Sequence, residues 1–269
     1  MASIKSNQPI GIFDSGIGGL TVAHQINKLL PNEKILYFGD TKHLPYGDKS
    51  SEAIVRFCEI ICHFLLDRKC KMIVVACNTA SALAFTQIKN IVKNKAIVVN
   101  VIDPIVEFTC KSSAKSVGII GTKNTISSNI YSKKILHLNP FLKTKSLATP
   151  LLVPMIEEGF YQNNISQSII SNYLESKELN DIDQLILGCT HYPLVEDEIT
   201  EFYGKDVNVV NSAKIVSKFI ESKLLKLNLL DSSLARTKHE FYVSDYTESF
   251  EQSAKYFFGK SIRLKKISL

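Results

Sequence analysis

The chain has 269 residues, enough for one or two domains with a large buried core and no need for stabilising disulfides or metals. Hydrophobic residues make up 45% and charged residues 22%, and there are only 12 glycines and 8 prolines, which excludes disordered, collagen-like and low-complexity chains. The net charge of +6 comes from scattered basic residues, which favours solubility and attraction of small anions over a specific nucleic-acid partner.

The first half of the chain alternates short apolar runs with amphipathic segments. The apolar runs predict strands over residues 9–13, 34–38, 71–76 and 96–102. The segments between them predict helices over residues 20–30, 51–66 and 81–93. Continuous apolar strands separated by helices favour a parallel sheet that is covered on both faces.

The second half restarts this pattern. It predicts strands over residues 116–120, 184–187, 207–210 and 240–243. It predicts helices over residues 124–138, 165–174, 195–202, 213–225 and 247–258, with a connecting region around 150–159 and a polar loop over 231–239. We therefore predict the α/β class, doubly wound, with mainly parallel sheets.

The N-terminal segment and the cysteines bear on the compartment. Residues 1–9 are polar and lack a secretory signal core, and no stretch approaches the roughly 18 apolar residues of a membrane span. We expect a cytoplasmic protein with no membrane partner, whose six cysteines are reduced. Cys58 and Cys62, with His63 or Cys70, could hold a metal, but a buried helix stripe explains their spacing more simply, so we expect no metal.

Two segments of the first half resemble two segments of the second. Residues 73–79, IVVACNT, resemble residues 185–191, LILGCTH. Residues 11–15, GIFDS, resemble residues 118–122, GIIGT, at nearly the same offset. This repetition predicts two related α/β halves and a cleft lined from both sides.

Cys77 and Cys189 follow the ends of two predicted strands, which is where ligands bind in open parallel sheets. Their polar neighbours, residues 78–79 and 190–191, argue against burial in a core. At a helix start, backbone N–H groups and the helix dipole are expected to lower the pKa of a thiol. Both cysteines are therefore candidates for chemistry.

A glycine-rich turn covers residues 14–19, DSGIGG, between the first strand and the first helix. It lacks the third glycine of the dinucleotide fingerprint, since position 21 is Thr21, and it lacks the Gly-Lys-Ser/Thr of a phosphate loop. Asp14 would repel a phosphate but would attract an ammonium group or orient a base. An ordinary turn or helix-capping role for Asp14 stays open.

Further polar residues lie near predicted strand ends or in loops. Pro45-Tyr46-Gly47 could contact a ligand or form a plain turn, and Thr122 with Thr125 marks a strand–helix junction suited to an anion. Glu157, by composition alone, belongs to a solvated charge pair. His191 could share a site with Cys189 or be a structural histidine.

The pairing of two cysteines narrows the chemistry. One cysteine with a histidine indicates nucleophilic catalysis, as in a thiol hydrolase. Two thiols in mirrored positions indicate a base on one face of a carbon and an acid on the other, which inverts a stereocentre. No motif points to a pyridoxal cofactor, so we expect no cofactor, and fixed N–H donors would have to stabilise the carbanion.

Four motifs combine these residues: GIFDSGIGG over residues 11–19, LPYG over 44–47, VACNTAS over 75–81 and LGCTHYP over 187–193. With them the sequence resembles the glutamate racemase family of the cofactor-independent aspartate/glutamate racemase superfamily. The resemblance extends to residues 153–159 and 241–245. Ser244, where many relatives have threonine, is a minor departure.

The resemblance implies two pseudo-symmetric domains, residues 1–99 plus 213–269 and residues 100–212, with the active site in the cleft between them. It implies interconversion of L-glutamate and D-glutamate, which supplies peptidoglycan synthesis in a bacterium, and a homodimer. Cys189 would take the α-proton from the L-enantiomer and Cys77 from the D-enantiomer. Asp14 would assist Cys77, and His191, oriented by Glu157, would assist Cys189.

The resemblance also implies a set of substrate-binding residues that hold the carboxylates and the amine. They are Asp14, Ser15, Pro45, Tyr46, Gly47, Asn78, Thr79, Thr122, Thr125, Thr190 and His191.

Three alternatives remain open at this point. A racemase of aspartate or a hydantoin would differ in the size of its cleft. A Cys–His hydrolase would need only one of Cys77 and Cys189. A non-catalytic protein that binds small anions would hold glutamate without exchanging its α-proton.

Overall fold

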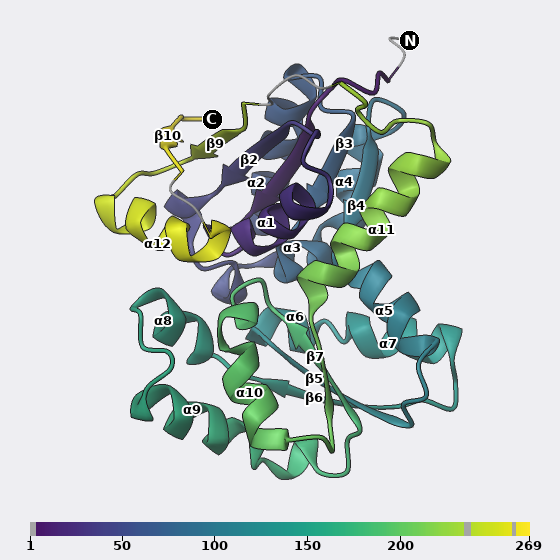
Figure 1. The fold of residues 1–269 in the computed structure, drawn as a ribbon, viewed down its shortest axis with the longest axis vertical. Helices are drawn as coiled ribbons and strands as arrows, with labels where there is room; N and C mark the ends of the chain where they lie inside the picture. Colours follow the sequence, from purple (N-terminus) through teal and green to yellow (C-terminus); the bar gives the residue numbers. More distant parts are fainter. Residues whose placement is uncertain (1–3, 234–237, 260–261) are drawn as a thin grey trace.

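The computed structural model describes residues 4–233, 238–259 and 262–269, which form two β-sheets with helices on both faces (Figure 1). The larger sheet has the strand order β10-β9-β2-β1-β3-β4, and the smaller has the order β6-β5-β7-β8. Every neighbouring pair of strands in both sheets is parallel. The predicted α/β class with parallel sheets is confirmed.

The strands of the larger sheet are β1 (Ile10–Asp14), β2 (Ile35–Gly39), β3 (Met72–Val75), β4 (Ile97–Asn100), β9 (Glu240–Val243) and β10 (Leu264–Lys266). Those of the smaller sheet are β5 (Ser116–Gly121), β6 (Lys143–Ala148), β7 (Gln184–Gly188) and β8 (Asn208–Val210).

The helices are α1 (Leu20–Leu29), α2 (Ser51–Asp67), α3 (Asn78–Leu83), α4 (Phe85–Val92), α5 (Ile102–Cys110), α6 (Lys123–Ser127), α7 (Ile130–Leu138), α8 (Leu152–Glu157), α9 (Asn164–Leu174), α10 (Glu196–Tyr203), α11 (Ser212–Lys226) and α12 (Glu248–Phe258). Short 3₁₀ helices cover Thr41–His43, Tyr46–Asp48, Lys177–Leu179 and Tyr192–Val195. Within the described residues, no helix is long and apolar enough to cross a membrane.

The two sheets share one topology. Strands β2-β1-β3-β4 of the larger sheet and β6-β5-β7-β8 of the smaller follow the same order relative to the chain. Strands β3 and β7 are therefore equivalent, and Cys77 and Cys189 each follow the end of that strand. The tertiary structure thus gives the repeated sequence motifs equivalent places.

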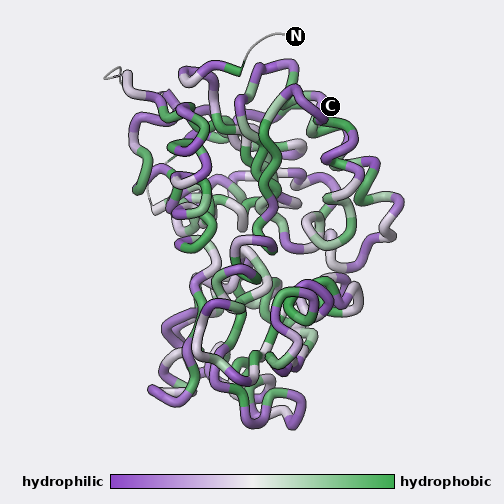
Figure 2. The backbone as a smooth tube through the Cα atoms, turned by 90° about the vertical axis from the view of Figure 1, so that its right-hand side faces the viewer, coloured by the Kyte–Doolittle hydropathy of each residue, from purple (hydrophilic) through white to green (hydrophobic). Residues whose placement is uncertain are grey.

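Burial on both faces explains the continuous apolar strands of the larger sheet. Ile10 and Ile12 of β1 pack in the same cluster as apolar residues of α1, α11 and α12, whereas Phe13 packs with α2 and the end of α4. The tube in Figure 2 shows hydrophobic segments gathered in the interior of each half and hydrophilic ones toward the outside. Alternate residues of a strand thus serve different helical layers.

The structure corrects the predicted end of the fourth strand. We predicted a strand over residues 96–102, but β4 ends at Asn100. The Asn100 side-chain oxygen accepts hydrogen bonds from the N–H groups of Ile102 (2.8 Å) and Asp103 (2.7 Å). This local side-chain bonding turns the backbone into helix α5, which the sequence analysis missed.

Two predicted helices are each divided. The helix predicted over residues 81–93 is α3 followed by α4, and α3 begins three residues earlier because the Cys77 sulfur caps it. The helix predicted over residues 124–138 is α6 followed by α7, because Asn129 has a φ of 56° in the left-handed region.

Three further elements, β6, β10 and α8, were not predicted. Strand β6 is a half-exposed edge strand of sequence KTKSLA, and β10 has only three residues, so neither contains an apolar run. Helix α8 lies in the region predicted as a connection. Residues 1–3 of the polar N-terminal segment and residues 234–237 of the predicted polar loop lie outside the described residues.

A buried ion pair lies at the start of the strands of the larger sheet, at the end away from the cysteines. Lys71 precedes β3, is fully buried, and lies 2.6 Å from the carboxylate of Glu33, which is itself almost fully buried. The Lys71 ammonium also donates to the carbonyls of Ser6 and Leu229 (2.8 Å for Leu229). These contacts join the start of β3 to the N-terminal segment and to the chain beyond α11.

We expect Lys71→Ala to destabilise the protein strongly. The substitution leaves the Glu33 carboxylate buried without its counter-charge, and breaking such a pair lowers the free energy of unfolding by about 3–5 kcal/mol. Urea denaturation measures this change. The matched control, Lys34→Ala, removes the partly exposed pair of Lys34 with Glu240 and is expected to cost less than about 1 kcal/mol. Equal losses in both variants would contradict this assignment.

Candidate active site

A cavity with a volume of about 30 Å³ lies where the strand ends of the two sheets meet. Both thiols, Cys77 and Cys189, line it. The other lining residues come from both sheets and their loops: Ser15, Leu44, Pro45, Tyr46, Gly47, Asn78, Thr79, Thr122, Val153, Thr190 and His191. The volume is room for about two water molecules, so the thiols lie in a narrow space.

Cys77 caps helix α3 from the larger-sheet side of the cavity. Its sulfur accepts a hydrogen bond from the Ala80 N–H at 3.5 Å and lies 3.7 Å from the Ser15 hydroxyl. Burial raises the pKa of the Cys77 thiol to about 12, and the charge of Asp14 adds to the rise, whereas Ala80 and Ser15 oppose it. Cys77 is therefore a protonated thiol at neutral pH, able to donate a proton.

These findings correct two expectations for the cysteines. Polar neighbours do not keep the thiols exposed, since Cys77 is 6% and Cys189 7% exposed. The helix start does not lower the pKa of Cys77, because loss of solvation outweighs the hydrogen bond from one backbone N–H.

Asp14 lies behind Cys77, fully buried and outside the cavity wall. One of its carboxylate oxygens accepts hydrogen bonds from the N–H groups of Gly16 and Gly19, both at 3.1 Å. Burial raises the pKa of Asp14, while the charge of His191 and the two N–H donors oppose the rise. The turn around Asp14 needs Gly18, because a Cβ there would lie 2.4 Å from the His191 ring.

Cys189 has a basic partner on the smaller-sheet side. Its sulfur lies 3.8 Å from Nδ1 of His191, and Nε2 of that ring lies 2.9 Å from Glu157. Burial by itself would lower the pKa of His191, but the contacts with Cys189 and Glu157 outweigh it and raise the pKa to about 10. At neutral pH the imidazolium thus stabilises negative charge that develops on the Cys189 sulfur.

Hydroxyl and amide groups from both sheets meet beside the thiols. Thr79 lies 2.9 Å from Thr122 and 3.3 Å from Thr125, and Thr122 lies 3.0 Å from Thr125, all between hydroxyl oxygens. The Asn78 amide oxygen accepts a hydrogen bond from Tyr131 at 2.6 Å. These bonds fix polar groups that face, or lie directly behind, the cavity wall.

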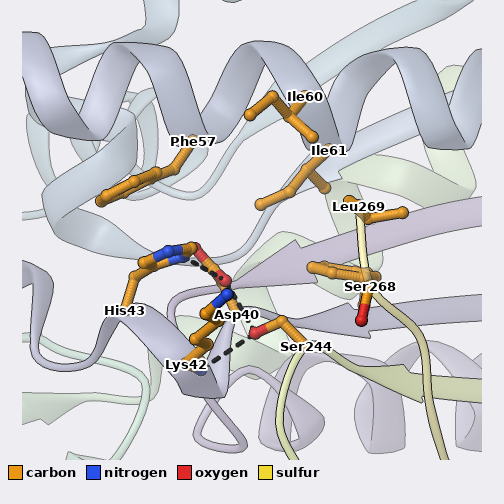
Figure 3. A pocket seen from close by; sticks show the side chains of 10 residues that line it. Asp40, Lys42, His43, Phe57, Ile60, Ile61, Ser244, Ser268 and Leu269 are labelled. Atoms are coloured by element: carbon orange, nitrogen blue, oxygen red, sulfur yellow. Dashed lines mark hydrogen bonds and ion pairs between the residues drawn. The ribbon is translucent and has the colours of Figure 1, made fainter.

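Tyr46 reaches the cavity from a loop that a buried carboxylate holds in place. The Tyr46 hydroxyl donates to Asp40 at 2.7 Å, and Ser244 donates to the same carboxyl group at 2.8 Å. His43 also contacts Asp40, at 2.9 Å, and stacks on Phe57 (Figure 3). Asp40 is only 3% exposed, so it is a rigid support for the loop rather than a solvated charge.

The structure brings most of the predicted site residues to one place. Of those predicted, Asp14, Thr125 and Glu157 do not line the cavity, although Thr125 contacts Thr122 and Glu157 contacts His191. Glu157 is a specific partner of His191, although composition alone suggested a solvated charge.

Sequence reasoning missed several residues of the site. Leu44 and Val153 line the cavity, and Asp40 and Tyr131 support it. Asp40 had a signal, because it directly follows the end of β2, the edge where ligands bind in parallel sheets. Nothing local marks Tyr131, which reaches Asn78 across 53 positions of the chain.

The remaining cysteines lie outside the cavity, and all six cysteines are free. Cys58 and Cys62 belong to the buried stripe of α2. Among the described residues, no group of three or more His, Cys, Asp or Glu side chains could hold a metal ion.

The chain is similar to known proteins over most of its length. The family model Asp/Glu/Hydantoin racemase matches residues 10–219. A protein named glutamate racemase 3 from Caldanaerobacter subterraneus subsp. tengcongensis is 38% identical over 262 residues, covering 97% of this chain and 94% of that protein. The crystal structure of glutamate racemase from Francisella tularensis in complex with D-glutamate superposes with a TM-score of 0.92 at 37% identity, covering 98% of both chains. An aspartate racemase homologue from Pyrococcus horikoshii, 19% identical with a TM-score of 0.57, shares the fold.

We expect Glu157→Gln to lower the pKa of His191 from about 10 to roughly 8–9. A hydrogen bond to a charged group contributes about 1.5–3 kcal/mol, and 1.4 kcal/mol corresponds to one pH unit. NMR titration of ¹⁵N-labelled histidine measures the change: near pH 9 the ring stays protonated in the native protein and loses much of its proton in the variant. The control is Glu158→Gln, an exposed neighbour, which should leave the titration unchanged. A His191 pKa that remains near 10 in Glu157→Gln would contradict this role.

Proposed function

Because the chain belongs to the Asp/Glu/Hydantoin racemase family, we propose that it interconverts L-glutamate and D-glutamate by proton transfer at the α-carbon. One observation carries the proposal. Two thiols follow equivalent strands of two sheets with the same topology and line one cavity. A hydrolase needs one nucleophile, whereas inversion of a stereocentre needs a proton acceptor and a proton donor on opposite faces.

We propose that Cys189 removes the α-proton of L-glutamate while Cys77 delivers one to the opposite face, with the roles exchanged for D-glutamate. The unequal surroundings support this division, since His191 carries positive charge beside Cys189 and the raised pKa of Cys77 keeps its proton in place. Asp14 assists Cys77, and Glu157 orients His191.

The substrate's charged groups need fixed polar partners. We assign its carboxylates and amine to Ser15, Pro45, Tyr46, Gly47, Asn78, Thr79, Thr122, Thr125, Thr190, His191 and Asp14. Support comes from the positions of these residues in or behind the cavity wall. Donors that are fixed before the reaction stabilise the carbanion-like transition state without reorganisation.

We further propose two domains, residues 1–99 plus 213–269 and residues 100–212. Membership of the two sheets supports this division, as does the packing of α11 against α1 of the first part. The protein would work in the cytoplasm, which keeps two catalytic thiols reduced, and supply D-glutamate for peptidoglycan. We propose a homodimer as well, supported by the half-exposed apolar side chains of Leu151, Phe160 and Ile165 around α8 and α9.

The first test is incubation of the protein with L-glutamate in D₂O without added cofactor. We expect optical rotation to fall to zero and deuterium to enter the α-position. With two bases, the D-glutamate formed early carries solvent deuterium, whereas the remaining L-glutamate is still mostly protonated. Exchange with aspartate alone would reassign the substrate, and no exchange with either amino acid would contradict the racemase proposal.

Cys77→Ser and Cys189→Ser are each expected to reduce racemisation by a factor of about 10²–10⁴, the contribution of general acid–base catalysis. Serine is too weak an acid to replace either thiol. Cys110→Ser, outside the cavity, is the matched control and should retain full activity. Normal racemisation by either active-site variant, or a trapped acyl-enzyme in the native protein, would contradict the two-thiol assignment.

A substrate with a leaving group on the β-carbon separates the two thiols. Elimination needs removal of the α-proton and no return of a proton, so one thiol is sufficient. Cys189→Ser should therefore still eliminate chloride from the D-enantiomer of β-chloroalanine, and Cys77→Ser from the L-enantiomer. Chloride release and pyruvate formation measure this. The reverse preference would exchange the assignments of the two thiols.

A further inference from the structure

The loop Leu44–Asp48 covers the cavity, and one side chain across the cleft holds it. Asn124, at the start of α6 beside the smaller sheet, donates two hydrogen bonds from Nδ2. They reach the backbone carbonyls of Tyr46 at 2.9 Å and Lys49 at 2.8 Å. Both partners can only accept, so the amide nitrogen, and not the amide oxygen, faces the loop.

The neighbouring contact across the cleft is weaker. Lys123 lies 3.6 Å from Asp48, but both side chains are more than 60% exposed, so water and salt screen the pair. Asn124 is half-buried and makes two bonds at normal lengths. Of these two adjacent side chains, Asn124 is the one that stabilises the closed position of the loop.

Cavity sizes indicate that this loop position is a closed state. The inner cavity holds about two waters, whereas glutamate is several times larger. A second cavity with a volume of about 170 Å³ lies next to it. The residues common to both cavities are Leu44, Pro45, Gly47, Thr122 and Val153. The loop that Asn124 holds therefore borders both cavities.

We propose that Asn124 is a positioning residue that latches the Leu44–Asp48 loop across the cleft and sets the balance between closed and open forms of the site. The inference rests on the proposed racemase function for its role in turnover. Its structural basis, two hydrogen bonds from one amide to a loop of the opposite sheet, is independent of the substrate. Breaking them lets the loop and the smaller sheet separate, which exposes both thiols together.

The test measures thiol accessibility site by site. The native protein and Asn124→Ala are treated with iodoacetamide for short times, and alkylation of each cysteine is quantified by peptide mass spectrometry. Two neutral hydrogen bonds of ordinary strength shift the closed-to-open balance roughly tenfold or more. We therefore expect Cys77 and Cys189 to react about tenfold faster in Asn124→Ala, because their alkylation requires the open form.

Other cysteines and variants provide the controls. Cys58 and Cys62 lie on the buried face of α2 and should stay protected, and Cys110 should react at an unchanged rate. Asn124→Asp keeps the side-chain shape but turns a carboxylate toward two carbonyl oxygens, so we expect a larger increase than with alanine. Lys123→Ala, next in the chain, should change the rates less than twofold because it removes only the exposed pair.

Turnover gives a second reading. Both enantiomers bind in the same cavity. In Asn124→Ala we therefore expect the KM to rise severalfold for L-glutamate and D-glutamate alike, and kcat to stay within about twofold of the native value. A native protein that does not racemise glutamate would refute the proposed function but leave the alkylation result interpretable. Unchanged alkylation rates of Cys77 and Cys189 would contradict the proposed role of Asn124. So would an equal rise in rate at all six cysteines, because that indicates destabilisation of the whole fold.

Discussion

Removing two thiols from water raises the free energy of their anionic forms. The charged and polar groups around the cavity either add to this effect or oppose it. Cys77 and Cys189 are both almost fully buried in a space that holds about two waters. A low-polarity space strengthens every charge interaction inside it. The polar residues around Cys77 therefore influence where its proton lies.

The two sulfurs occupy equivalent positions but have opposite partners. A buried carboxylate, Asp14, lies behind Cys77 and helps to keep it protonated. An imidazolium, His191, lies beside Cys189 and is itself supported by Glu157. A carboxylate near one sulfur and an imidazolium beside the other make the two thiols unequal, which is the arrangement in which one group gives a proton and the other accepts one. Sheet topology supplies the symmetry, and the loops and helices around the strand ends supply the difference in charge.

Much of the site is held by contacts between the two sheets. The hydroxyl cluster of Thr79, Thr122 and Thr125 and the bond from Tyr131 to Asn78 join the base of the cleft. Asp40 fixes the Tyr46 loop from the first sheet, and Asn124 reaches it from the second. These contacts position the polar groups at the cavity and also join the two sheets.

The sequence by itself determined the α/β class, most strands and helices, and the two cysteine motifs, because buried parallel strands are continuous apolar runs and ligand-binding residues follow their ends. The sequence analysis missed β6, because an exposed edge strand has no apolar run. It missed α5, because a single side chain, Asn100, ends β4 early. Only the tertiary structure decided the state of the site. Burial of Cys77, the pairing of Glu157 with His191 and the reach of Asn124 to Tyr46 join residues far apart in the chain. Local polarity suggested exposed thiols and a solvated Glu157, but solvation depends on what the fold packs against a residue, and that information is not local.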